Sequence, residues 1–245
     1  MLPRILATSG GFVAGSVTPS ARPGVMLLDA LARTGALRPR VCLVLTASGD
    51  DAAYYAVMFE AFTAAGCDVV PLRLFPQPSA DPLERLTSSD LVWVGGGSVA
   101  NLLNLWRLHG VDTAMREAHA RGTILAGVSA GSICWHTSGT TDSFGPTLRP
   151  VLDGLGLVPF GNGVHYDSEP QRRPLLHRLV GEQILPAISY ATDDHIGIWY
   201  EGVEATEVVS DGGFDATQPT SPAAYLIERS GTAVTETRLP VGPVG

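Results

Sequence analysis

Positive charge is scarce in this sequence. Lysine and arginine together account for 16 of 245 residues, against 24 aspartates and glutamates, so the formal net charge is -8 at pH 7. Proteins that bind nucleic acid do so largely through clustered basic side chains that neutralise phosphates. We therefore do not expect nucleic acid as a partner.

Cysteines and long apolar runs are also few. The cysteines Cys42, Cys67 and Cys134 show neither C-x-x-C spacing nor Cys/His ligand spacing, so we expect buried free thiols in a reducing compartment. No stretch approaches the roughly 18 consecutive apolar residues of a membrane helix. The amino terminus, MLPRILATSGG, lacks the pattern of a signal peptide. These absences predict a soluble cytoplasmic protein that does not contact membranes.

The remaining composition is that of an ordinary globular protein. Hydrophobic residues make up 45% and charged residues 16% of the chain, enough apolar material for one sizeable core. No stretch rich in Pro, Gly or Ser marks a linker, although 144–150 and 212–222 look like surface loops. We therefore predict a single domain over residues 1–245.

Short apolar runs alternate with helical patterns in the first half of the chain. The runs are Arg4–Thr8, Val41–Thr46, Cys67–Leu74, Leu91–Val94 and Thr123–Val128. Between them, apolar residues recur at i, i+3, i+4 and i+7, in Tyr55, Met58, Phe59 and Phe62 and again in Val99, Leu102, Leu103 and Trp106. Continuously apolar strands are buried on both faces. The pattern predicts an α/β fold, a mostly parallel sheet with helices on both faces.

The last third of the chain has little helical pattern. Its apolar runs are Ile188–Thr192, Ile196–Tyr200, Thr206–Ser210, Ala223–Arg229 and Ala233–Arg238, separated by Gly, Asp and Pro. Such spacing is typical of hairpins. We therefore predict antiparallel C-terminal strands.

Two strand-to-helix junctions are candidate sites, because ligands of parallel sheets bind at the carboxyl ends of the strands. At the first junction, Leu91–Val94 is followed by Gly95-Gly96-Gly97-Ser98, where backbone can approach a ligand closely. At the second, Gly127-Val128-Ser129-Ala130-Gly131 matches the G-x-S-x-G nucleophile elbow. A sharp turn there exposes the Ser129 hydroxyl and aims the Ala130 amide at a developing oxyanion.

A serine nucleophile needs a base and an acid that orients it. His165, in the loop-like stretch 161–167, and His195, just before a strand, both fit as the base. His109, His119, His136 and His177 lie on expected helices, His136 on the one that follows the elbow, and fit surface or packing roles better. Spacing alone leaves several acids open: Asp142, Asp167, Glu169, Asp193 and Asp194.

Four segments in order, VWVGGGSVANLL, AGVSAGSICW, TTDSFGP and VHYDSEPQRR, resemble the peptidase E family of the class I glutamine amidotransferase-like superfamily. The resemblance implies Ser129 as nucleophile and His165 as base, with Val164 where the family usually has Pro. It implies Asp142, after the Thr-Thr pair, as the acid, with Glu169 in reserve. It also implies an oxyanion hole of Ala130 with Gly96 or Gly97.

The resemblance further implies a serine peptidase that removes N-terminal aspartate from short peptides without a metal or cofactor. A substrate carboxylate calls for a cation, and Arg172 and Arg173 follow the His165 loop. The expected partner is therefore a small peptide substrate, and a homodimer stays open.

Three other functions stay open. A cyanophycinase-like peptidase shares the serine turn and the arginines after the histidine. An α/β-hydrolase esterase could use Ser129 and His195 with Asp193 or Asp194, although the usual HGGG segment is missing. A glutaminase is disfavoured because those enzymes have Cys at the elbow. A non-catalytic binding protein on the same fold is the alternative from another class.

Overall fold

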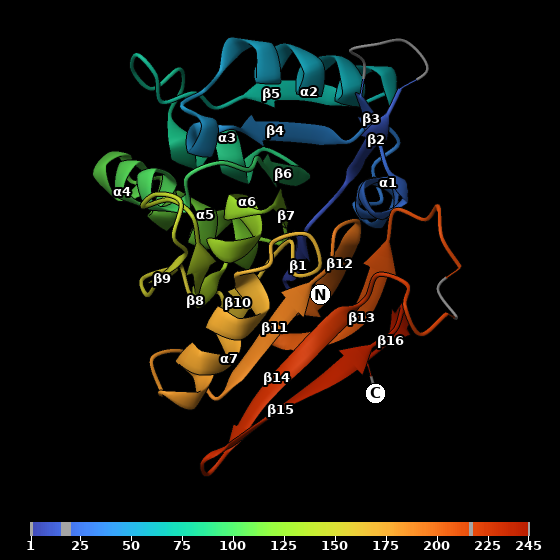
Figure 1. The fold of residues 1–245 in the computed structure, drawn as a ribbon. Coiled ribbons are helices and arrows are strands. Elements are labelled where there is room, and N and C mark those ends of the chain that lie inside the picture. The colour runs from blue at the N-terminus through green and yellow to red at the C-terminus, as the bar shows by residue number, and fades with distance from the viewer. Residues whose placement is uncertain (1, 16–20, 216–217, 245) are drawn as a thin grey trace.

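The computed structural model describes residues 2–15, 21–215 and 218–244, and the described chain is built around two β-sheets (Figure 1). The larger sheet has eight strands in the order β16-β13-β12-β1-β7-β6-β4-β5. Their bounds are β1 Arg4–Thr8, β4 Arg40–Val44, β5 Asp68–Pro71, β6 Leu91–Val94, β7 Ile124–Val128, β12 Ile196–Glu201, β13 Glu204–Ser210 and β16 Gly242–Pro243. Strands β1, β7, β6, β4 and β5 are parallel to one another. Strand β12 pairs antiparallel with β1, β13 with β12, and β16 with β13.

Helices cover both faces of this sheet, as predicted. Helices α1 (Val25–Arg33) and α2 (Ala52–Ala64) cover one face, where Leu6 packs with Met26 and Phe62. The other face, where Ile5 packs in a cluster with Trp106, carries helices α3 to α6. These are α3 Pro82–Thr87, α4 Val99–His109, α5 Val111–Ala120 and α6 Ala130–Ile133. Successive residues of β1 thus enter opposite cores, which is why the strand sequences are continuously apolar.

A second, six-stranded sheet follows the elbow in sequence, in the order β15-β14-β11-β10-β8-β9. Its strands are β8 His136–Thr141, β9 Arg149–Val151, β10 Val158–Gly163, β11 Ile188–Thr192, β14 Ala224–Ser230 and β15 Ala233–Leu239. Helix α7 (Arg172–Gly181) packs on this sheet through Leu176. A short hairpin, β2 (Phe12–Ala14) with β3 (Ala21–Pro23), and the 3₁₀ turn η1 (Thr46–Ser48) complete the elements.

The sequence predicted only part of this second sheet. Antiparallel C-terminal strands are confirmed for β12–β13 and β14–β15, but β11 also pairs in parallel with β10. His136 does not lie on the helix after the elbow, because α6 ends at Ile133 and His136 begins β8. The residues after it, Thr137 to Thr141, include three β-branched threonines that favour a strand.

The three cysteines are buried and unpaired, as expected. Over the described ranges, no helix combines the length and apolarity that crossing a bilayer requires. The single-domain assignment for residues 1–245 stays a prediction.

We expect Gly127→Ala to lower the free energy of unfolding by about 3 kcal/mol, because its Cβ would lie 2.4 Å from the Gly131 carbonyl oxygen. Gly181→Ala is the control, since its Cβ would meet Val234 Cγ2 at an ordinary 3.4 Å. Urea denaturation of both variants measures the difference. Equal midpoints for the two variants would contradict the tight packing of α6 on β7.

Candidate active site

Ser129 lies at the sharp turn between β7 and α6. Its backbone has φ 57° and ψ -112°, a conformation that non-glycine residues rarely adopt, at a cost of about 1–3 kcal/mol. The Ser129 amide donates a hydrogen bond to the Thr8 carbonyl oxygen at 3.0 Å, which fixes the turn to the end of β1. The strand–turn–helix context expected of a nucleophile elbow is therefore present.

The glycine loop after β6 lies directly against this serine. A Cβ on Gly96 would lie 3.3 Å from Ser129 Cβ, and one on Gly97, whose φ is +133°, would lie 2.3 Å from the Ala47 carbonyl oxygen. Only glycine therefore fits at Gly97 without displacing η1. The neighbouring Tyr54 hydroxyl has a raised pKa because it is buried, while a hydrogen bond from the Gly96 amide partly lowers that pKa.

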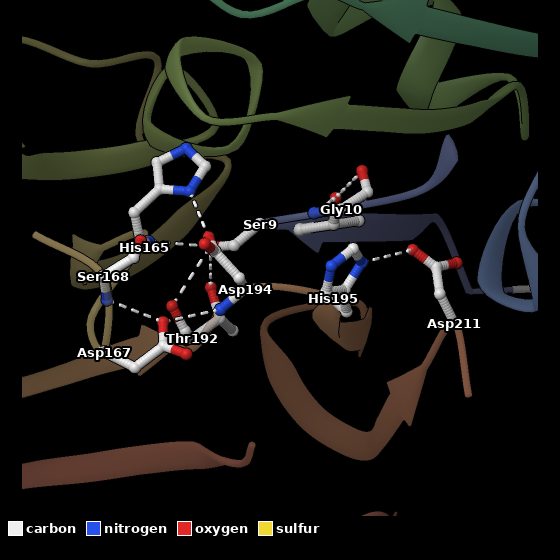
Figure 2. Close-up of polar contacts among 10 residues, drawn as sticks. Ser9, Gly10, His165, Asp167, Ser168, Thr192, Asp194, His195 and Asp211 are labelled. Carbon is white, nitrogen blue, oxygen red and sulfur yellow. Dashed lines mark hydrogen bonds and ion pairs between the residues drawn. The ribbon is translucent and has the colours of Figure 1, made fainter. Parts of the chain in front are cut away.

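His165 pairs with Asp194, and both residues follow neighbouring parallel strands. The histidine lies two residues beyond β10 and the aspartate two residues beyond β11. His165 Nδ1 lies 2.5 Å from Asp194 Oδ1 (Figure 2). Because an ionised carboxylate only accepts hydrogen bonds, Nδ1 carries the proton and Nε2 is left with its lone pair.

The pKa of Asp194 is lower than usual. Burial is the largest single influence and raises it, but hydrogen bonds from His165 and Ser168 and the charges of His165 and His195 together lower it. Asp194 is therefore a carboxylate at neutral pH. A permanently charged partner is what holds an imidazole ring in one tautomer and stabilises its protonated form.

Ser9 connects the two sheets at this point. Its hydroxyl accepts a hydrogen bond from the His165 amide at 3.0 Å and lies 2.7 Å from the hydroxyl of Thr192, the last residue of β11. Thr8, which holds Ser129, is the preceding residue. Consecutive residues of β1 and its extension thus anchor the backbones of Ser129 and His165. Sequence reasoning missed Ser9, although its place after the first strand was a usable signal.

The acids inferred from the family resemblance lie elsewhere. Asp142 is exposed in the turn after β8, and half-buried Glu169 donates its backbone amide to the His165 carbonyl oxygen. Among the hydrogen bonds and ion pairs of the described residues, none joins either carboxylate to the His165 ring, which pairs with Asp194 instead. The geometry therefore favours Asp194 over Asp142 as the acid, because the β10–β11 pairing brings the Asp194 carboxylate to the His165 ring.

The two arginines expected to read a substrate carboxylate are engaged in other contacts. Arg172 is only 4% exposed, and its guanidinium donates to the Thr140 carbonyl oxygen. The guanidinium of Arg173 lies 4.6 Å from the ring centroids of Tyr166 and Tyr225 and pairs with Glu236 at 3.2 Å. Both side chains thus support the second sheet, and the geometry does not favour them as substrate ligands.

The triad of an α/β-hydrolase esterase is not assembled around His195. Its Nδ1 lies 3.8 Å from Asp211 Oδ2, whereas Asp194 pairs with His165. Asp193 accepts hydrogen bonds from the Ala223 amide at 2.9 Å and the Tyr225 hydroxyl at 3.1 Å.

The fold and this strand-end cluster define an α/β protein with a serine elbow beside a histidine–aspartate pair. The profile of peptidase family S51 matches residues 6–208, and the chain belongs to that family. The resemblance to peptidase E is thereby confirmed, and the chain is a peptidase.

Relatives and a solved structure agree with this assignment. The chain is 36% identical over 209 residues to YgaJ of Bacillus subtilis (strain 168), described as an uncharacterized peptidase, covering 85% of this chain and 86% of that one. It is 31% identical over 186 residues to Peptidase E of Streptomyces coelicolor (strain ATCC BAA-471 / A3(2) / M145), covering 72% and 73%. A crystal structure of a peptidase from an acI-B1 Actinobacterium shares the fold, with a TM-score of 0.65, 14% identity and coverage of 99% of this chain and 97% of that one.

We expect Asp194→Asn to slow covalent labelling of Ser129 by a phenyl phosphonate by about 10³-fold, because His165 would lose the charge that stabilises its protonated form. Asp142→Asn should label at close to the wild-type rate. Mass spectrometry of the adduct over time measures both rates. A slow Asp142 variant beside a fast Asp194 variant would restore the acid inferred from the family resemblance.

Burial raises the pKa of Asp193 from 3.8 to about 6. A raised folded-state pKa means that its contribution to stability is complete below about pH 4 and is lost as the pH rises through 6. We therefore expect Asp193→Asn to gain roughly 1–3 kcal/mol over the wild type in unfolding free energy between pH 4 and pH 7. Urea denaturation at both pH values tests this. If the difference in unfolding free energy between the variant and the wild type does not change with pH, burial does not raise the pKa of Asp193.

Proposed function

We propose that this peptidase hydrolyses short peptides with an N-terminal aspartate through a serine-bound acyl-enzyme. The observation that carries the proposal is the 2.5 Å hydrogen bond between His165 and Asp194. The His165 backbone is held by Ser9 and the Ser129 turn by Thr8, two consecutive residues at the end of β1. The aspartate preference is inferred from the resemblance to peptidase E. The relative from Streptomyces coelicolor bears that name.

In the first step, Ser129 Oγ attacks the carbonyl carbon of the scissile bond while His165 Nε2 takes the hydroxyl proton. Asp194 stabilises the resulting imidazolium through Nδ1. The tetrahedral intermediate then collapses, His165 gives its proton to the leaving amine, and the acyl group stays on Ser129. Water attacks the ester carbonyl in the second step, with His165 again taking a proton and then returning it to Ser129 Oγ.

The oxyanion would form beside the amides of Ala130 and of the glycine loop. Ala130 is the first residue of α6, directly after the nucleophile. Because the Gly96 amide interacts with Tyr54, we assign the second donor to Gly97, with Gly96 providing the space beside Ser129. Removal of one such donor typically costs 10²- to 10³-fold in rate.

Steady-state hydrolysis of dipeptides with N-terminal Asp, Glu, Asn, Arg or Leu tests the proposal, with cyanophycin and a p-nitrophenyl ester alongside. We expect turnover of the aspartyl dipeptides and at least about a 10³-fold loss with Ser129→Ala. Ser88→Ala, an exposed serine before β6 at the opposite edge of the sheet, is the control and should keep full activity.

Cleavage of only the ester or only the polymer would replace the aspartyl-peptidase proposal by the corresponding alternative. Absence of both turnover and phosphonate adduct would favour a binding protein on this fold.

A further inference from the structure

A second histidine–aspartate pair lies beside the first. Among the described non-glycine residues, five have positive φ: Asp50, Ser129, His165, Gln183 and His195. Three of the five, Ser129, His165 and His195, are hydrogen-bonded through their backbones to Thr8 or Ser9 at the end of β1, and two of these three are the proposed nucleophile and base. Strained backbone of this kind clusters at functional sites. His195, with φ 66°, has no role in the mechanism above.

The fold makes room for a buried carboxylate beneath His195. Asp211 is 1% exposed at its side chain, and its Oδ2 accepts a hydrogen bond from the Gly11 amide at 2.7 Å. A Cβ on Gly10 would lie 2.7 Å from Oδ2, and one on Gly24 would lie 2.1 Å from Oδ1. Both glycines are therefore needed for this carboxylate to fit.

Burying Asp211 is costly, because its Oδ1 has no hydrogen-bond partner among the described residues. Burial is also the main reason why the pKa of Asp211 is raised. The ring above it is 56% exposed, and Figure 2 shows that ring between Asp194 and Asp211 with one nitrogen turned to Asp211. Among the contacts of the described residues none engages the other ring nitrogen, which can therefore bind a ligand. A buried acid at ion-pair distance from an exposed imidazole, here 3.8 Å, resembles the support given to a functional histidine.

His195 lies within reach of a bound dipeptide. It precedes β12, whose amino end lies at the same edge as the carboxyl ends of β1 and β7 because β12 runs antiparallel to β1. Only β1 separates β12 from the strand that carries Ser129. Two strand spacings separate the backbones by about 10 Å, and the His195 ring and the aspartyl side chain would span that gap together, because that side chain belongs to the residue that is acylated on Ser129.

The two arginines that follow the His165 loop are not available to read an acidic substrate. The sequence contains no lysine, and Arg172 and Arg173 are held by Thr140 and by two tyrosine rings. Resting on the proposed function, we propose that His195 binds the side-chain carboxylate of the substrate's N-terminal aspartate. Asp211 is the positioning residue that fixes the His195 ring and supplies the countercharge for its protonated form.

Kinetics with L-Asp-L-Leu and its neutral isostere L-Asn-L-Leu test this assignment. We expect His195→Ala to lower kcat/KM for Asp-Leu by about 10- to 100-fold, mainly by raising KM. The same substitution should leave kcat/KM for Asn-Leu, which we expect to be low, unchanged. His195→Gln, which keeps an N–H donor, should restore part of the preference. Asp211→Asn should also reduce the ratio of kcat/KM for Asp-Leu to kcat/KM for Asn-Leu. The control His109→Ala, at the end of α4, should leave this ratio unchanged. Equal losses on both substrates, or no loss, would overturn the assignment.

A binding measurement separates this inference from the proposed function. In Ser129→Ala, the ring resonances of His195, assigned with His195→Gln, should shift saturably with succinate and not with succinamide. No shift, or the same shift with both, would overturn the inference. If succinate binds in this way but the wild type cleaves no aspartyl dipeptide, the carboxylate site stands and the proposed function fails. If aspartyl dipeptides are cleaved equally well without His195, the inference alone fails.

Discussion

The site depends on one short stretch of backbone, the extension of β1 that contains Ser9. The Ser9 amide donates to Ile196 at 2.8 Å, and its carbonyl oxygen accepts from His195 at 3.1 Å. Its hydroxyl accepts from His165 and contacts Thr192 of the second sheet. A single serine therefore links the end of β11 and the start of β12 to the central strand. Through this junction His165, which follows a strand of the second sheet, and His195, which precedes a strand of the large sheet, are bonded to the same residue.

This arrangement concentrates strain at one edge of an otherwise regular core. Ser129, His165 and His195 each hold a positive φ, and each such residue costs about 1–3 kcal/mol. The compensation comes from strands that are buried on both faces, such as β6, in which every residue is inaccessible to solvent. The packing energy of the sheet thus holds these three residues in backbone conformations that the same segments would not adopt in isolation.

Much of the fold could be predicted from sequence because its signals are local. The continuously apolar strands and the residues of α2 and α4 at helical spacing were placed correctly, and the elbow was recognised from five consecutive residues. The second sheet was not recognised. Its strand β8 begins directly after a helix of four residues, too short for a periodic pattern, and β10 carries Gly161 and Gly163 that look like a loop.

The sequence by itself determined the parallel core, the serine turn and the candidates for its base, because each depends on residues that are adjacent in the chain. Only the tertiary structure decided which acid meets His165, where the arginines point and that Asp211 lies under His195. The two histidine–aspartate pairs join residues 29 and 16 positions apart, and they follow from strand order and register. Spacing along the chain carries no information on register between distant strands, so five acids were equivalent until β10 and β11 were seen to lie side by side.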